Sequence, residues 1–238
     1  MKRTILAGAL LAGALAALPA GAAIGAGVTQ CTGILSDTTI NGPLEVPSGA
    51  GCALDGVHVN GSLKIDPGAA LSIGVDNGLN PSSISGSVTG TSIEAFDSFG
   101  PASSIGGGLS LTGVTNVPMN GPLAPLAPGS LGVDNFNYLD SLRISGATSI
   151  SKGAASAPWT DANAPRFNGS FSYTNNGGEL DLTDGSFFGA GVSLHGNTGG
   201  GTLDSMTVSG SLLCGNAPAF SVGSLSVSGY NAAKGGTC

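Results

Sequence analysis

Charged side chains are scarce in this chain: Asp, Glu, Lys and Arg together make up 9% of its 238 residues. Aromatic residues contribute only 5%, and there are one tryptophan and two histidines. The net charge of −7 excludes the basic surface on which nucleic-acid binding depends. With two histidines and no Cys-x-x-Cys pair, a zinc site is not expected, and nothing in the sequence indicates a cofactor.

The low hydrophobicity that is typical of disordered chains is also missing. Hydrophobic residues reach 41%, and the mean hydropathy is positive, at +0.30. The chain contains 42 glycines, which suit many short strands and tight turns and suit long helices poorly. The length and composition therefore predict a folded all-β protein.

The N-terminus has the three parts of a signal peptide. Lys2 and Arg3 are followed by an apolar run over residues 5–18, and then by Pro19 and an Ala-x-Ala pattern at residues 20–22. A membrane anchor is the alternative, but the leucine-rich part is shorter than the ~20 residues that a span needs. We predict a signal peptide over residues 1–27, export to the medium or cell surface, and no stable membrane insertion after cleavage. The mature chain would carry five basic against fourteen acidic residues, a net charge of −9.

A seven-residue motif, apolar-x-Gly-x-apolar-x-apolar, recurs along the chain. It reads INGPLEV at residues 40–46 and VNGSLKI nineteen residues later, at 59–65. Full or partial copies follow at residues 84–88, 105–111, 119–123, 144–150, 167–173, 208–214 and 227–229. Spacings of about 20 residues are typical of one turn of a parallel β-solenoid, in which stacked strands bury one face. We interpret each copy as a strand followed by a turn, and expect the recurrent glycine at a corner where φ is positive.

The predicted fold is therefore a single-domain, right-handed parallel β-helix over residues 28–238. An antiparallel β-sandwich would also give short strands and glycine turns, but it would not require the same motif to recur. Two stretches interrupt the pattern: residues 117–129, with four prolines, and residues 151–165, rich in alanine. Both are expected to be loops that leave the coil.

Four cysteines lie near the two ends of the predicted coil, at Cys31, Cys52, Cys214 and Cys238. Four cysteines allow three pairings. About eight stacked turns would separate the two ends by ~35–40 Å, whereas the Cα atoms of a disulfide lie within ~7 Å. If the chain is a solenoid, only Cys31–Cys52 and Cys214–Cys238 can form. Such loops would cover the open strand edges at both ends, which favours a monomer.

Parallel β-helices are the fold of many polysaccharide lyases and hydrolases, and glycoside hydrolysis needs two nearby carboxylates. Asp181 and Asp184 are close in sequence, and Asp204 falls about one turn later, so these three form a candidate acidic patch. The alternative is a turn over residues 181–185, ending in Asp-Gly. Trp159 could stack on a sugar ring, as could Tyr138, Tyr173 and Tyr230, although packing against the coil is the commoner use of aromatic residues.

Calcium and serine-protease chemistry have weaker support. Residues 76–80 and 134–137 offer clustered oxygens, but neither matches a known calcium loop, and Asx-turns are the favoured interpretation. Asn-Gly-Ser at residues 60–62 and 168–170 matches a glycosylation sequon but is better explained as a corner of the repeat. His58 and His195 are expected to point outward, and no Gly-x-Ser-x-Gly elbow accompanies them.

The motif at residues 40–46 and 59–63, the turns at residues 52–56 and 67–69, and residues 213–216 together resemble small exported β-helix proteins of actinobacteria-like genomes. Such proteins mostly have no assigned function, so the resemblance implies fold and export and no activity. The sequence favours an exported, non-enzymatic structural or adhesive protein, whose partners would be cell-wall or extracellular glycans. A polysaccharide-active enzyme and a carbohydrate-binding module are the alternatives.

Overall fold

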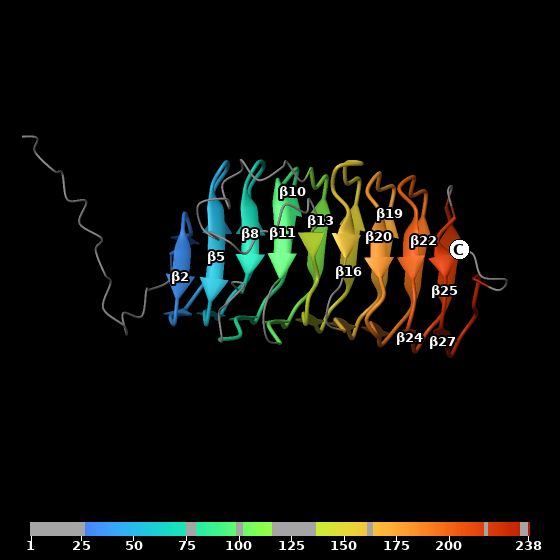
Figure 1. Cartoon of the computed structure of the whole chain (residues 1–238). Helices are drawn as coiled ribbons and strands as arrows, with labels where there is room; N and C mark the ends of the chain where they lie inside the picture. Colours follow the sequence, from blue (N-terminus) through green and yellow to red (C-terminus); the bar gives the residue numbers. More distant parts are fainter. Residues whose placement is uncertain are drawn as a thin grey trace, which may run out of the picture.

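The computed structural model describes residues 27–74, 80–98, 102–115, 137–160, 164–216, 219–233 and 238. Within these ranges all regular elements are β-strands, and every ladder between them is parallel. The strands form three faces that run the length of one coil of about eight turns (Figure 1). In Figure 1 the near strands point down while the chain advances from blue to red, as in a right-handed coil. The predicted β-solenoid is confirmed.

Each face takes every third strand of the chain, because one turn of the coil contributes one strand to each face. Face 1 comprises β1 (Thr29–Gln30), β4 (Leu44–Val46), β7 (Leu63–Ile65), β10 (Val88–Thr91), β13 (Leu109–Thr112), β16 (Thr148–Ser151), β19 (Phe171–Thr174), β22 (Val192–His195) and β25 (Leu212–Gly215). Face 3 comprises β3 (Thr39–Ile40), β6 (His58–Val59), β9 (Ser83–Ile84), β12 (Ser104–Ile105), β15 (Arg143–Ile144), β18 (Arg166–Phe167), β21 (Phe187–Phe188), β24 (Met206–Val208) and β27 (Leu225–Val227).

Face 2 lies between them and has two parts, joined by a single bridge from Ser98 to Leu139. Its first part comprises β2 (Ile34–Ser36), β5 (Gly51–Asp55), β8 (Ala70–Ile73) and β11 (Ala95–Ser98). Its second part comprises β14 (Asn137–Tyr138), β17 (Trp159–Thr160), β20 (Leu180–Leu182), β23 (Gly201–Leu203) and β26 (Ser221–Val222).

The sequence motif spans a corner of the coil rather than one strand and a turn. In the first copy Ile40 ends β3 on face 3, Gly42 lies at the corner, and Leu44 and Val46 lie on β4 of face 1. All three apolar positions point inward and are buried. On face 3 the first position stacks in register through every turn as Ile40, Val59, Ile84, Ile105, Ile144, Phe167, Phe188, Val208 and Val227. The apolar core is therefore a set of columns parallel to the coil axis.

The glycine of the motif is required by close stacking, and among the motif glycines that the structure describes the expected positive φ is found only at Gly42. A Cβ added to Gly146 would lie 2.7 Å from the amide nitrogen of Gly108 and 2.8 Å from the carbonyl carbon of Gly107. The amide of Gly146 donates to the carbonyl of Gly107 at 2.9 Å, and Gly107 donates in turn to Gly86 at 3.0 Å. Main chain lies directly on main chain at this corner, so a side chain has no room.

Polar side chains bond the other two corners from one turn to the next. Between faces 1 and 2, the side-chain amide of Asn197 donates to Asn216 Oδ1 at 2.9 Å, and its own oxygen accepts from the side-chain and backbone N–H of Asn176. Asn176 and Asn197 are 1% and 0% exposed. Between faces 2 and 3, Ser103 Oγ accepts from the backbone of the buried Ser82 at 3.1 Å. These ladders supply hydrogen-bond partners for buried polar groups, which the apolar columns cannot do.

Both predicted disulfides are present. Cys31 pairs with Cys52 and Cys214 pairs with Cys238, with Cα–Cα distances of 5.5 and 5.2 Å. Each bond joins neighbouring turns at one end of the coil, as the separation of the two ends requires.

The loop predicted over residues 151–165 is partly wrong. It contains β17, whose Trp159 and Thr160 pair with β14 on one side and β20 on the other, so this stretch belongs to face 2. The proline-rich stretch at residues 117–129, the predicted signal peptide up to residue 26 and most of the two candidate calcium segments lie outside the described residues.

Candidate functional site

The three aspartates of the candidate acidic patch lie on two consecutive turns, at or just after strands of face 2, with Asp181 and Asp184 on one turn and Asp204 on the next. Asp181 is on β20 and accepts the backbone N–H of Thr202 on the next turn at 2.8 Å. Asp204 follows β23 and accepts the backbone N–H of Ser224, again one turn later. This backbone hydrogen bond lowers the pKa of Asp204. Two of the three carboxylates thus accept hydrogen bonds from the main chain of the next turn, as aspartates with a structural role in turns do.

Asp184 lies between β20 and β21 and is followed by Gly185, whose φ is +81°. A glycine with positive φ after an aspartate is typical of a tight turn, in agreement with the turn interpretation of residues 181–185. Among the described residues, no group of three or more His, Cys, Asp or Glu side chains is placed to hold a metal ion.

Trp159 cannot stack on a sugar at the surface, and this candidate role is wrong. The side chain is 0% exposed and points into the coil, where its ring stacks with Phe96 at a centroid distance of 6.2 Å. Tyr173 is likewise 0% exposed, and its hydroxyl donates to the carbonyl of Gly178 at 2.9 Å. Burial raises the pKa of Tyr173. Both rings therefore belong to the core. Inward positions in this half of the coil carry the largest side chains.

Tyr230, His58 and His195 are at the surface and are separated from one another. Tyr230 is 65% exposed near the C-terminal end. His58, on β6, and His195, at the end of β22, are both exposed, as predicted. His58 Nδ1 lies 2.8 Å from Ser83 Oγ on the next turn of face 3. The two imidazoles belong to different faces and to opposite ends of the coil, so they do not form a shared site.

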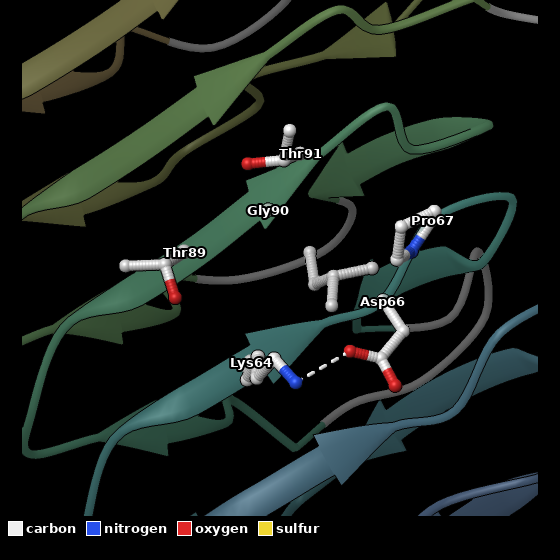
Figure 2. Close-up of a pocket in the computed structure, with 7 residues that line it drawn as sticks. Lys64, Asp66, Pro67, Thr89, Gly90 and Thr91 are labelled. Atoms are coloured by element: carbon white, nitrogen blue, oxygen red, sulfur yellow. Dashed lines mark ion pairs between the residues drawn. The ribbon is translucent and has the colours of Figure 1, made fainter.

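A small pocket of about 150 Å³ lies on face 1 between β7 and β10 (Figure 2). Lys64 and Asp66 line one side, with a Nζ–Oδ1 distance of 2.7 Å, and Lys64 also contacts Glu45 at 3.0 Å. These hydrogen bonds, led by that to Asp66, raise the pKa of Lys64. Thr89 and Thr91, with Gly90 between them, line the other side. The pocket marks the point where the outer side of face 1 changes from charged to hydroxyl side chains.

From β10 to β22 the outer side of face 1 carries two columns of small hydroxyl side chains. One column is Thr89, Ser110, Ser149, Ser172 and Ser193, in register through four ladders. The other column is Thr91, Thr112, Ser151 and Thr174, with His195 in the fifth place. We call these nine serines and threonines the hydroxyl face.

The hydroxyl face is regular because the strands beneath it are in register and alternate. In each strand the residue between the two hydroxyls points inward: Gly90, Leu111, Ile150, Tyr173 and Leu194. Consecutive parallel strands lie ~4.8 Å apart, and residues i and i+2 of a strand lie ~6.6 Å apart. The nine side chains therefore form a two-column grid, and all are at least partly exposed.

Sequence reasoning missed the hydroxyl face, although its signal is present. Residues 110–112, 149–151 and 172–174 read SLT, SIS and SYT, a hydroxyl on either side of the seventh motif position. These residues do not resemble a catalytic site, because single serines in a glycine-rich chain do not indicate a reaction. Only the register between turns shows that they form one surface.

Within the described ranges, no helix has the length and apolar character needed to cross a membrane. Comparison of the chain with protein-family models, with characterised proteins and with solved structures found no match to any of the three.

Proposed function

We propose that this protein is an exported, non-enzymatic module of the cell surface or medium, and that the hydroxyl face is its contact surface. The observation that carries the proposal is the pair of disulfides, Cys31–Cys52 and Cys214–Cys238, because disulfides persist in oxidising, extracytoplasmic compartments. The signal-peptide pattern of residues 1–27 supports the same location.

A binding role fits the chemistry of the surface better than catalysis does. The candidate carboxylates Asp181 and Asp204 bond the main chain of the next turn. The hydroxyl face, in contrast, presents nine similar groups at regular intervals over five strands. Many weak, repeated contacts give adhesion to an extended surface through multivalency and do not require a reactive centre.

Fractionation of the source cells, with thiol labelling before and after reduction, tests the location. The expected result is a chain shortened by about 27 residues, found in the medium or envelope fraction, with thiols reactive only after reduction. A cytosolic enzyme followed in the same fractions controls for lysis. A full-length chain in the cytosol with free thiols would refute export.

A second experiment separates binding from catalysis. The triple variant Asp181→Ala, Asp184→Ala, Asp204→Ala is compared with the wild-type chain for release of reducing sugar from envelope polysaccharides. The proposal expects no release by either protein. Release by the wild-type chain that the variant lacks would instead establish a polysaccharide-active enzyme.

A further inference from the structure

We propose that the hydroxyl face binds ice, through an ordered array of hydrogen bonds between its serine and threonine hydroxyls and the water lattice. The inference rests on the proposed function, in that an exported adhesive face is the one that would meet ice outside the cell. It adds the identity of the ligand.

The first support is the two-dimensional period. The columns repeat at ~4.8 Å along the coil and are ~6.6 Å apart within a strand. The register is unbroken from Thr89 to Ser193 and from Thr91 to Thr174, including the ladder between β13 and β16, which are further apart in sequence than the other pairs. A surface that repeats in two directions suits a ligand that is itself periodic, and ice is a periodic array of water molecules.

The second support is the uniform, neutral chemistry of the grid. A hydroxyl donates one hydrogen bond and accepts two, so a grid of hydroxyls can join a lattice in which every water both donates and accepts. Charged groups would impose hydration shells of their own. On face 1 the ion-paired groups Glu45, Lys64 and Asp66 lie outside the grid, on its N-terminal side.

The absence of exposed rings on the grid favours ice over polysaccharide. Binding of sugar chains commonly uses exposed aromatic rings, whose apolar faces stack on the sugar. The phenylalanine and tyrosine of these five strands, Phe171 and Tyr173, point inward and are 1% and 0% exposed. A neutral surface without rings offers a sugar only hydroxyl contacts, each of which exchanges for a contact with water at little net gain.

The third support is the rigidity of the base. The grid lies on a parallel ladder whose inner side is a buried apolar column of Leu111, Ile150, Tyr173 and Leu194. Thr112 and Ser151 contact each other across turns at 3.3 Å, which places neighbouring hydroxyls within one hydrogen-bond length. A preformed array avoids the entropic cost of ordering the surface at the moment of binding. Because each contact is weak, the five successive strands must act together.

The test uses the purified mature chain with both disulfides intact and growing polycrystalline ice as the probe. The fraction of protein taken into the ice is measured against a globular protein that ice excludes. The wild-type chain is expected to concentrate in the ice fraction. Ser149→Lys and Thr112→Lys place a long charged side chain in the middle of the grid, and each is expected to lower uptake about tenfold by lifting several hydroxyls off the lattice.

Two control variants keep the test falsifiable. Thr207→Lys introduces the same side chain at an exposed outward position of β24 on face 3 and is expected to leave uptake unchanged. Thr112→Ser keeps the hydroxyl and is expected to retain most of the uptake. Melting temperatures of all variants identify any that fail to fold. If Thr112→Lys fails to fold, Thr112→Val takes its place in the test, because valine keeps the shape of threonine and removes the hydroxyl.

Exclusion of the wild-type chain from ice, or equal loss of uptake in Thr207→Lys, would overturn the inference. If the wild-type chain is excluded from ice but is retained by insoluble cellulose or chitin, and Ser149→Lys abolishes that retention, the ice inference fails while the adhesive role of the face stands. If neither surface retains the chain, both the inference and the adhesive role fail. Export is judged separately by fractionation.

Discussion

Replacement of Asn197 by aspartate probes the buried asparagine ladder with almost no change of shape. The side-chain amide of Asn197 donates to the backbone carbonyl of Tyr173 at 2.8 Å and to Asn216 Oδ1 at 2.9 Å. Its oxygen accepts from Asn176 N at 3.0 Å and Asn176 Nδ2 at 3.2 Å. In Asn197→Asp the accepting oxygen is kept, but the donating nitrogen becomes an oxygen that faces two acceptors.

The expected cost follows from those contacts. One buried and one partly buried acceptor lose their donor, at ~1–3 kcal/mol each, so we expect the free energy of unfolding to fall by about 2–6 kcal/mol at neutral pH. The residue is 0% exposed, and an ionised carboxylate there would add a desolvation penalty, which places the result in the upper part of that range.

The cost should depend on pH in one direction. Burial and the two facing acceptors disfavour the ionised form, so the pKa of the introduced carboxyl is raised in the folded state above its unfolded value of ~3.9. A raised folded pKa gives stability that is fully present below the unfolded pKa and is lost as the pH rises through the folded pKa. The difference between wild type and variant should therefore be smallest near pH 4, where a neutral carboxyl restores one donor, and largest above pH 7.

Urea unfolding at pH 4 and pH 7.5, with the disulfides intact, measures both values. Asn175→Asp is the matched control, because Asn175 is exposed in the same corner and aspartate tolerates its φ of +55°. Equal stability of the two variants at pH 7.5 would refute the hydrogen bonds assigned to the asparagine ladder. So would a loss of unfolding free energy in Asn197→Asp that does not shrink toward pH 4.

Three further predictions address the core, the glycine corner and a partly buried carboxyl. Gly146→Ala should lower the free energy of unfolding by ~1–3 kcal/mol, since its Cβ would lie 2.7–2.8 Å from main-chain atoms of the preceding turn. Thermal melts measure the loss. Gly33→Ala, with no atom within 4 Å of its Cβ, is the control and should be nearly neutral. Phe188→Ala should cost ~3–5 kcal/mol in urea unfolding, because that ring is 0% exposed and stacks on its neighbour of the preceding turn at 5.0 Å; a loss below ~1 kcal/mol would contradict the packing. Burial raises the pKa of Glu94, so the wild-type chain loses stability as the pH rises through that pKa, and Glu94→Gln should melt higher than wild type at pH 7 with no such gain at pH 4.

The coil could be predicted from the sequence because the inward apolar positions repeat within each motif and the motif repeats from turn to turn. The motif repeated the inward positions closely enough to indicate turns of about 20 residues, and the ends of a stacked coil were far enough apart to select the cysteine pairing. The same motif placed its glycine at a corner, but it did not show that close stacking of main chain, rather than a positive φ, is the reason. Gly61 and Gly146 look like turn residues in sequence, whereas main chain packed from the neighbouring turn is what excludes a side chain from them.

The site could be predicted much less well, because the local signal of its residues does not show that they form one surface. Trp159 falls in an alanine-rich stretch that reads as a loop, yet its neighbours in space are Leu180 and Phe96, from other turns. The asparagine ladder is visible in sequence only as Asn176, Asn197 and Asn216, which lie 21 and 19 residues apart. Contacts between turns decide both features, and a single sequence does not show which residues of neighbouring turns are in register.

The hydroxyl face is not explained by the needs of the fold. Outward positions of this coil tolerate varied chemistry, since face 3 carries Arg143, Arg166 and Phe187 on three consecutive turns without any change of register. Strand propensity favours threonine and β-branched residues, and it does not favour serine, which fills four of the five places in the first column of the hydroxyl face.

A position that accepts arginine or phenylalanine on one face, and holds a small hydroxyl on five successive turns of another, is constrained by something other than folding. The inward residues between those hydroxyls vary from glycine to tyrosine, while the outward residues of the first column stay serine or threonine from Thr89 to Ser193. The constraint therefore acts from the solvent side. If it is a regular ligand, lysine in the middle of the grid should lower uptake about tenfold at unchanged stability, and the same lysine on face 3 should change neither uptake nor stability.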